Sequence, residues 1–255
     1  MRRVGAVATP LLVLFLFLLL WEAAVGIFGT PAYILPAPTA IVAAFFARFP
    51  TLLHHAAITL AEIVLGLALG GLAGIALALA ILYSRTLERA LYPLIIASQM
   101  IPVFAIAPLL IVWMGFGLWP KAVVAALIGF FPIVVNASDG LRAPSRASIE
   151  LFRSMGASKV QILTKLRLPA SLPTLLAGLK VATTLCVVGA TIGEWVGASR
   201  GLGYLMLQSN ALLRVDLVFA AILMLSLLGL LLFGGLRIIE WRVLRWRRAE
   251  RDASN

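Results

Sequence analysis

Three ionisable residues, Glu62, Lys180 and Glu194, stand inside long apolar stretches of the sequence. A charged side chain in hydrocarbon is costly, so such groups usually face protein or water and mark a pathway or an ion pair. The position of Lys180 favours a side chain that extends to the membrane surface. Glu194 precedes Trp195, and together they either line a solute path or lie in the interfacial belt, the second interpretation being slightly favoured.

The remaining reactive residue types form no catalytic or metal-binding pattern. His54 and His55 are adjacent, without a further ligand at metal-binding spacing. Cys186 is the single cysteine and lies in an apolar run. The sequence has no nucleophile–base constellation and no Gly-x-x-x-x-Gly-Lys-Ser/Thr phosphate loop. We therefore expect no enzyme activity and no cofactor in this chain; an intramembrane enzyme and a simple membrane anchor are disfavoured alternatives.

The composition indicates an integral membrane protein. Of its 255 residues, 62% are hydrophobic and 12% charged, whereas soluble domains carry about 25% charged residues. The net charge of +11 comes from basic residues between long apolar stretches, which favours basic loops of a membrane protein over nucleic-acid binding. Six apolar stretches are long enough to cross a bilayer: Thr9–Phe28, Ala57–Tyr83, Ala90–Gly115, Pro120–Ser138, Leu172–Gly193 and Leu217–Leu236. The first is interpreted as a retained span, with a cleaved signal peptide as the alternative.

The distribution of Lys and Arg predicts the orientation. With the N-terminus inside, sixteen basic residues fall in cytoplasmic segments and four in outer ones, namely Arg48, Lys121, Arg200 and Arg214. This positive-inside asymmetry predicts that both termini are cytoplasmic. The basic tail, residues 237–255, is expected to lie on the inner leaflet.

Small residues and prolines indicate how the spans pack. Gly66, Gly70 and Gly74 recur every four residues, a pattern that lets another helix approach closely. The third stretch contains Pro93, Pro102 and Pro108, which predict a broken helix beside a path, or an ordinary kinked helix. The candidate pathway residues are Gln99, Pro102, Asn136, Thr191, Glu194 and Trp195.

The longest polar interval, residues 139–171, contains two short amphipathic helices joined by a glycine. The first is predicted over Ala147–Met155 and ends at Gly156; the second covers Ser158–Leu166, with Ser158 as its N-cap. Leu168-Pro169 is expected to stop the second helix. We name residues 147–166 the elbow. By composition alone, an elbow that lies on anionic lipid is the favoured interpretation.

The spacing within this interval resembles the EAA motif of permeases from ATP-binding-cassette (ABC) importers. Glu150, Gly156 and Leu168-Pro169 occupy the motif's fixed positions, whereas Leu151-Phe152 replaces the usual Ala-Ala pair. The resemblance runs from about Tyr92 to the end of the sixth span. It implies a single permease domain over 1–255, an all-α polytopic membrane protein of the type I importer (MetI-like) fold with six transmembrane helices, in which the elbow is the coupling helix.

The resemblance also implies the location, a bacterial inner membrane, and the partners. Two ATPase subunits would bind ATP and Mg, a second copy of the permease would complete a homodimer, and a periplasmic or lipid-anchored protein would deliver the solute. The ATPase-coupling residues would be Glu150, Leu151, Phe152, Gly156, Ala157, Ser158, Leu168 and Pro169.

The whole chain resembles the nitrate/sulfonate/taurine-type permeases. It is most similar to the branch that imports thiamine-precursor pyrimidines such as hydroxymethylpyrimidine in three segments, Gln99-Met-Ile-Pro102, Phe130-Phe-Pro132 and Gly193-Glu-Trp-Val-Gly197. The resemblance therefore implies an importer of such a pyrimidine. Taurine, alkanesulfonate, nitrate or riboflavin is the alternative solute.

Overall fold

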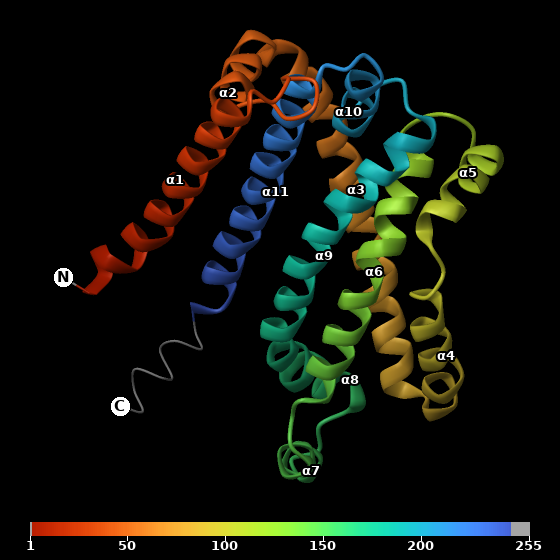
Figure 1. The fold of residues 1–255 in the computed structure, drawn as a ribbon. Helices are drawn as coiled ribbons and strands as arrows, with labels where there is room; N and C mark the ends of the chain where they lie inside the picture. Colours follow the sequence, from red (N-terminus) through yellow and green to blue (C-terminus); the bar gives the residue numbers. More distant parts are fainter. Residues whose placement is uncertain (1, 246–255) are drawn as a thin grey trace. The chain divides into compact units, whose positions relative to one another are not determined.

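A computed structural model describes residues 2–245, with side chains from Thr9 onward, and the secondary structure of this part of the chain is helical, without a strand (Figure 1). The helices are α1 (Arg2–Phe28), α2 (Pro38–Ala47), α3 (Phe49–Tyr83), α4 (Arg85–Ser98), α5 (Val103–Met114), α6 (Leu118–Arg142), α7 (Arg146–Ser154), α8 (Lys159–Ile162), α9 (Leu168–Gly197), α10 (Leu202–Ala211) and α11 (Val215–Val243), with a π-helical turn, η1, over Leu163–Arg167. The last ten residues of the predicted basic tail, 246–255, lie outside the described residues.

Among the described residues, five helical segments are long and apolar enough to cross a membrane, and the bent pair α4 and α5 makes six when it is counted as one span. The all-α membrane fold is confirmed, and the prediction of six spans agrees with this count. The second span is longer than predicted, because α3 begins at Phe49 and continues without a break to Tyr83. Lys121, predicted in an outer segment, lies inside α6 and is 7% exposed.

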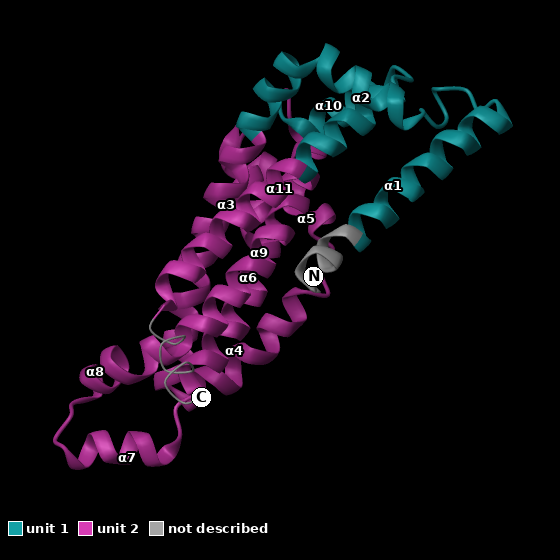
Figure 2. Ribbon diagram, turned by 90° about the vertical axis from the view of Figure 1, so that its left-hand side faces the viewer, with its two compact units in different colours: residues 1–58, 200–226 teal, residues 59–199, 227–255 magenta. Residues whose placement is uncertain are grey.

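The described residues group into two compact units (Figure 2). Unit 1 comprises residues 1–58 and 200–226, and unit 2 comprises 59–199 and 227–255. In unit 1, Glu22 of α1 accepts hydrogen bonds from the backbone N–H of Thr39 at 3.0 Å and from its hydroxyl at 2.7 Å. Because Thr39 lies in the first turn of α2, these bonds fasten α2 to α1.

In unit 2, α6 packs along α3 on one side and along α9 on another, and the close approach depends on glycine. A Cβ atom at Gly66 would lie 2.5 Å from the Cβ of Ala125, and one at Gly74 would lie 3.0 Å from Cγ2 of Ile133. At the α6–α9 contact, a Cβ at Gly189 would lie 2.7 Å from Cα of Ala125. The predicted glycine packing face of the second span is thus confirmed, and α6 is its partner.

The third span is broken once. Helices α4 and α5 meet at an angle of 99° across residues 99–102, and Pro102 is the N-cap of α5. Pro93 and Pro108 lie inside helices. Of the three prolines, only Pro102 therefore coincides with a break, and the other two are accommodated within continuous helix.

The expected stop at Leu168-Pro169 is wrong. Helices α8 and α9 and the π-helical turn between them form one helical segment, Lys159–Gly197, in which Pro169 lies in the first turn of α9. A proline ring collides with the carbonyl four residues earlier in a regular α-helix. The π-helical turn directly before it, where the Leu168 N–H donates to the carbonyl of Leu163, replaces that regular geometry. The chain therefore passes Pro169 without ending the helix.

Candidate functional site

The first helix of the elbow, α7, is closed at both ends by local hydrogen bonds. At its start, Oγ of Ser145 accepts from the N–H of Ser148 at 3.1 Å. At its end, Gly156 has φ +78°, its N–H donates to the carbonyl of Arg153, and the next N–H, of Ala157, donates to the carbonyl of Phe152, both at 2.9 Å. This bond pair is the Schellman motif, which requires a left-handed residue and therefore favours glycine.

The second helix of the elbow starts with a reciprocal cap. Oγ of Ser158 accepts from the N–H of Gln161 at 3.2 Å, and Oε1 of Gln161 accepts from the N–H of Ser158 at 2.8 Å. Such a capping box satisfies two donors that the first turn leaves open. The predicted break at Gly156 and the predicted N-cap at Ser158 are both confirmed.

The elbow exposes a set of large apolar side chains. Leu151 is 60% exposed, Met155 77% and Val160 66%. None of the residues of α7 is buried, and Glu150 is exposed while Phe152 is half-buried. The two residues of the Leu151-Phe152 pair therefore differ in exposure, and Leu151 faces away from the rest of the described chain. Exposed apolar surface rimmed by charge is typical of a protein-binding face.

The root of the elbow is anchored in the helix bundle of unit 2. A guanidinium nitrogen of Arg167 donates to the carbonyl of Leu141 at 3.1 Å, at the end of α6. Leu163 and Leu168 pack against a buried cluster formed by α3 and α6. The elbow therefore exposes Leu151 and Met155, while the residues that follow it, from Leu163 to Leu168, are joined to α6 and continuous with α9.

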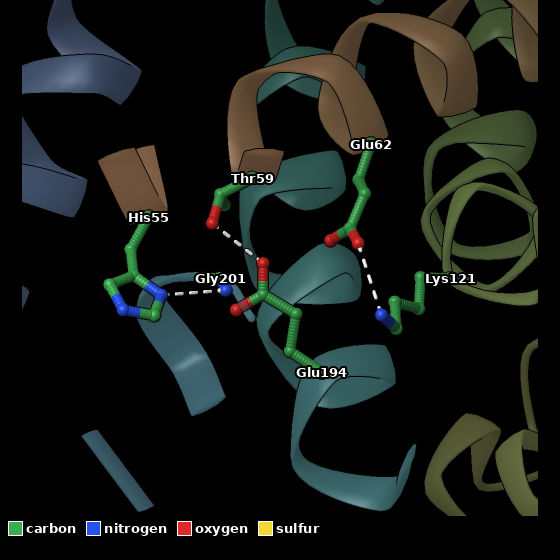
Figure 3. Close-up of polar contacts among 6 residues, drawn as sticks. All are labelled: His55, Thr59, Glu62, Lys121, Glu194 and Gly201. Atoms are coloured by element: carbon green, nitrogen blue, oxygen red, sulfur yellow. Dashed lines mark hydrogen bonds and ion pairs between the residues drawn. The ribbon is translucent and has the colours of Figure 1, made fainter. Parts of the chain in front are cut away.

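A second group of polar residues lies deep in unit 2, and we name it the buried polar cluster: Thr59 and Glu62 of α3, Lys121 of α6 and Glu194 of α9 (Figure 3). The hydroxyl of Thr59 donates to Oε1 of Glu194 at 2.6 Å. Nζ of Lys121 lies 3.4 Å from Oε1 of Glu62. Thr59 and Glu62 are 0% exposed and Glu194 is 1% exposed. The cluster therefore joins three helices through groups withdrawn from water.

The buried polar cluster holds two carboxyl groups and one ammonium group. The side chain of Glu62 interacts both with the carboxyl group of Glu194 and with Lys121. Removing one member of a buried ion pair is far more costly than removing both, so Lys121 is expected to be needed wherever Glu62 is present.

One interpretation of the in-span charges is wrong. Glu194 does not lie in outer water, because it is 1% exposed and bonded to Thr59. Nζ of Lys180 lies 2.8 Å from Oε2 of Glu240 in α11, and the extension of Lys180 to the membrane surface stays a prediction. In both cases the side chain has a partner far along the chain that its position in the sequence did not indicate.

The other candidate pathway residues do not gather at one place. Gln99 and Pro102 lie exposed at the break between α4 and α5. Nδ2 of Asn136 donates to the carbonyl of Pro132 at 2.8 Å. The hydroxyl of Thr191 donates to the carbonyl of Val187 at 2.9 Å, and Trp195 is 43% exposed. A pathway role for these residues stays a prediction.

Sequence reasoning missed Thr59 and Lys121 as members of the buried polar cluster. Lys121 follows Pro120 at the start of an apolar stretch, which made it look like a loop residue. The available signal was that Glu62 required a positive partner in apolar surroundings, but nothing in one sequence identified which of the basic residues it was.

The chain matches the family described as "Binding-protein-dependent transport system inner membrane component" over residues 66–245. It belongs to this family. With the six spans and the elbow, this membership makes the chain a multi-pass permease of an ABC importer.

The chain is similar over nearly its whole length to permeases of several ABC importers. The chain is 42% identical to a probable ABC transporter permease protein of Haemophilus influenzae, over 93% of this chain and 96% of that one. It is 41% identical to the formylaminopyrimidine transport permease ThiX of Halalkalibacterium halodurans, over 98% of this chain and the whole of the other. It is 36% identical to the riboflavin transport system permease RibX of Chloroflexus aurantiacus, over 91% and 88%.

The fold has a counterpart among solved structures. A chain of the MetNI methionine ABC transporter, solved in inward-facing conformations, superposes with a TM-score of 0.68 at 22% identity, covering 77% of this chain and 98% of that one. At this identity the likeness concerns the fold alone. The predicted MetI-like fold is confirmed.

Proposed function

We propose that this permease imports a thiamine-precursor pyrimidine of the aminopyrimidine type, driven by two ATPase subunits that dock on the elbow. The observation that carries the coupling part is the elbow itself, which is capped at each turn and presents Leu151, Met155 and Val160 outward. The solute part is supported by identity over the whole chain to a relative named for formylaminopyrimidine.

The attachment of the elbow indicates how a conformational change would reach the transmembrane helices. A partner bound to the exposed side of α7 would move α8, and α8 is continuous with α9 through the π-helical turn. A π-helical turn is an irregular point where a helix can adjust its twist. Arg167 at that turn holds the carbonyl of Leu141, so motion of the elbow is delivered to α6 and α9 together.

The assembly has two permease copies, an ATPase pair on the elbow side and a solute-binding protein on the opposite side. The elbow side is cytoplasmic by the positive-inside rule, which gives sixteen basic residues against four by sequence, or three when the buried Lys121 is set aside. Both termini then lie in the cytoplasm and the membrane is the bacterial inner membrane. ATP and Mg belong to the ATPase subunits.

The solute is tested by uptake into proteoliposomes that contain the permease with its cognate ATPase and solute-binding protein. We expect ATP-dependent uptake of labelled formylaminopyrimidine or hydroxymethylpyrimidine, and none of labelled taurine. Riboflavin is the second candidate, because a relative named for riboflavin is 36% identical. Uptake of taurine or riboflavin without pyrimidine uptake would contradict the proposed solute and leave the elbow assignment standing.

A further inference from the structure

A cavity of about 480 Å³ opens in unit 2 between the ends of α3, α4 and α6. Three arginines line it: Arg85 and Arg89 from the first turns of α4, and Arg142 from the last turn of α6. Two carboxylates, those of Glu88 and Asp139, lie on the same walls. The lining therefore carries one more positive than negative charge.

The charges in this cavity are only partly matched. A guanidinium nitrogen of Arg142 lies 2.7 Å from Oε1 of Glu88, which ties α6 to α4. Arg85 and Arg89 also attract the Glu88 carboxylate, but neither forms an ion pair within the described residues. Two guanidinium groups with ten N–H donors between them thus converge on one cavity without an anion of their own.

Two further features point to an anion as the occupant. Ser138 lines the cavity and is 5% exposed, and its hydroxyl has no hydrogen-bond partner among the described residues. The cavity also lies at the N-terminus of α4, a 14-residue helix whose dipole favours negative charge there. The positive-inside rule explains basic residues near this membrane face, but it does not require them to surround a cavity with an unpartnered buried hydroxyl.

We propose that this cavity is a binding site for a phosphate group, reached from the same side of the membrane as the elbow. Guanidinium groups bind phosphate through paired N–H donors, and Ser138 supplies a hydroxyl donor. The volume exceeds that of phosphate alone, and the ring of Tyr92, which is 38% exposed, lines the same wall. A phosphate monoester on a small heterocycle fits these features, and so does the phosphomonoester headgroup of a lipid in the adjacent leaflet.

The site has a consequence for transport, which rests on the proposed function. An anion held by Arg85 and Arg89 of α4 and by Ser138 of α6 would add a second link between these helices, and α4 is the half of the broken span that starts at this end. Occupancy would then hold these helix ends together and slow the change between inward- and outward-facing states. A phosphorylated small molecule that binds from the elbow side of the membrane would therefore inhibit transport.

The test measures binding to the full-length permease in detergent, by thermal shift and by calorimetric titration. The soluble probes are inorganic phosphate and adenosine 5′-monophosphate; the lipid arm compares nanodiscs of phosphatidylcholine with and without phosphatidic acid. The double variant Arg85→Gln/Arg89→Gln removes two charges and leaves the Glu88–Arg142 pair. The matched control, Arg146→Gln/Arg153→Gln, removes two exposed charges from α7.

We expect phosphate or adenosine monophosphate to bind the wild type and the control alike, and the double variant to bind at least about tenfold more weakly, since charge-assisted hydrogen bonds are lost. Ser138→Ala is expected to weaken binding severalfold without a change of charge. Stabilisation by phosphatidic acid alone, lost in the same variants, supports the headgroup as the source. Absence of binding in both arms, or equal binding by the double variant and its control, overturns the proposal. Because no ATPase or solute is present, failure here leaves the proposed function intact.

Discussion

The elbow and the buried polar cluster place polar groups in opposite ways. In the elbow, Ser158, Gln161 and Gly156 form bonds with backbone at most three residues away. In the buried polar cluster, Thr59 is bonded to Glu194 across 135 residues, and Lys121 reaches Glu62 on another helix. The elbow is exposed and locally determined, whereas the cluster is buried and exists only once the helices have packed. Mutations in the first are therefore expected to affect coupling, and mutations in the second to affect folding.

The largest effect is expected from Gly156→Pro. Proline cannot adopt φ +78° and lacks the N–H that bonds to Arg153. The variant should insert and assemble, yet its solute-stimulated ATP hydrolysis should be abolished. Gly156→Asn is the control, because asparagine tolerates the left-handed conformation and should retain most of the coupling. Normal stimulation in Gly156→Pro would remove the distinction between the two regions.

The next effect is a loss of stability in Lys121→Met. This substitution removes the ammonium that lies 3.4 Å from Oε1 of the buried Glu62 and leaves that side chain without its partner, which costs about 3 kcal/mol of unfolding free energy. Thermal unfolding in detergent measures the loss, with Lys165→Met, at an exposed lysine, as the control. The double variant Glu62→Gln/Lys121→Met should recover much of the stability. A single variant as stable as the wild type would show that the pair is not needed for packing.

A smaller loss is expected from Gly66→Ala. The new Cβ would lie 2.5 Å from that of Ala125 and 2.9 Å from the carbonyl oxygen of Ala122, so α3 and α6 must separate, at a cost of about 1–3 kcal/mol. Gly71→Ala meets only the tip of Leu179, at 4.0 Å, and should be neutral or slightly stabilising. Thermal unfolding in detergent measures the stability of both variants. Equal stability of Gly66→Ala and Gly71→Ala would contradict the described packing.

The same contrast explains which features could be predicted from sequence. The helix break at Gly156 and the cap at Ser158 depend on neighbours within one turn, and the glycine face at Gly66 is visible as a four-residue repeat within one helix; each was predicted and confirmed. The helix that packs on the glycine face, α6, was not predicted. The pairing of Lys180 with Glu240 was missed because it depends on packing between helices 60 residues apart. The predicted helix stop at Pro169 was wrong for another reason. A π-helical turn accommodates the proline, and no residue type indicates such a turn.

The claim that the ATPase subunits dock on the elbow is tested most directly by cross-linking. In a Cys186→Ser background, Leu151→Cys places a thiol at a position that is 60% exposed on α7, and Val188→Cys places one at a position that is 51% exposed on α9. In the assembled, transport-active importer, a short photo-reactive maleimide on Leu151→Cys should form an adduct with the ATPase subunit, whereas the same reagent on Val188→Cys should not. An active complex in which Leu151→Cys forms no adduct with the ATPase would contradict the account.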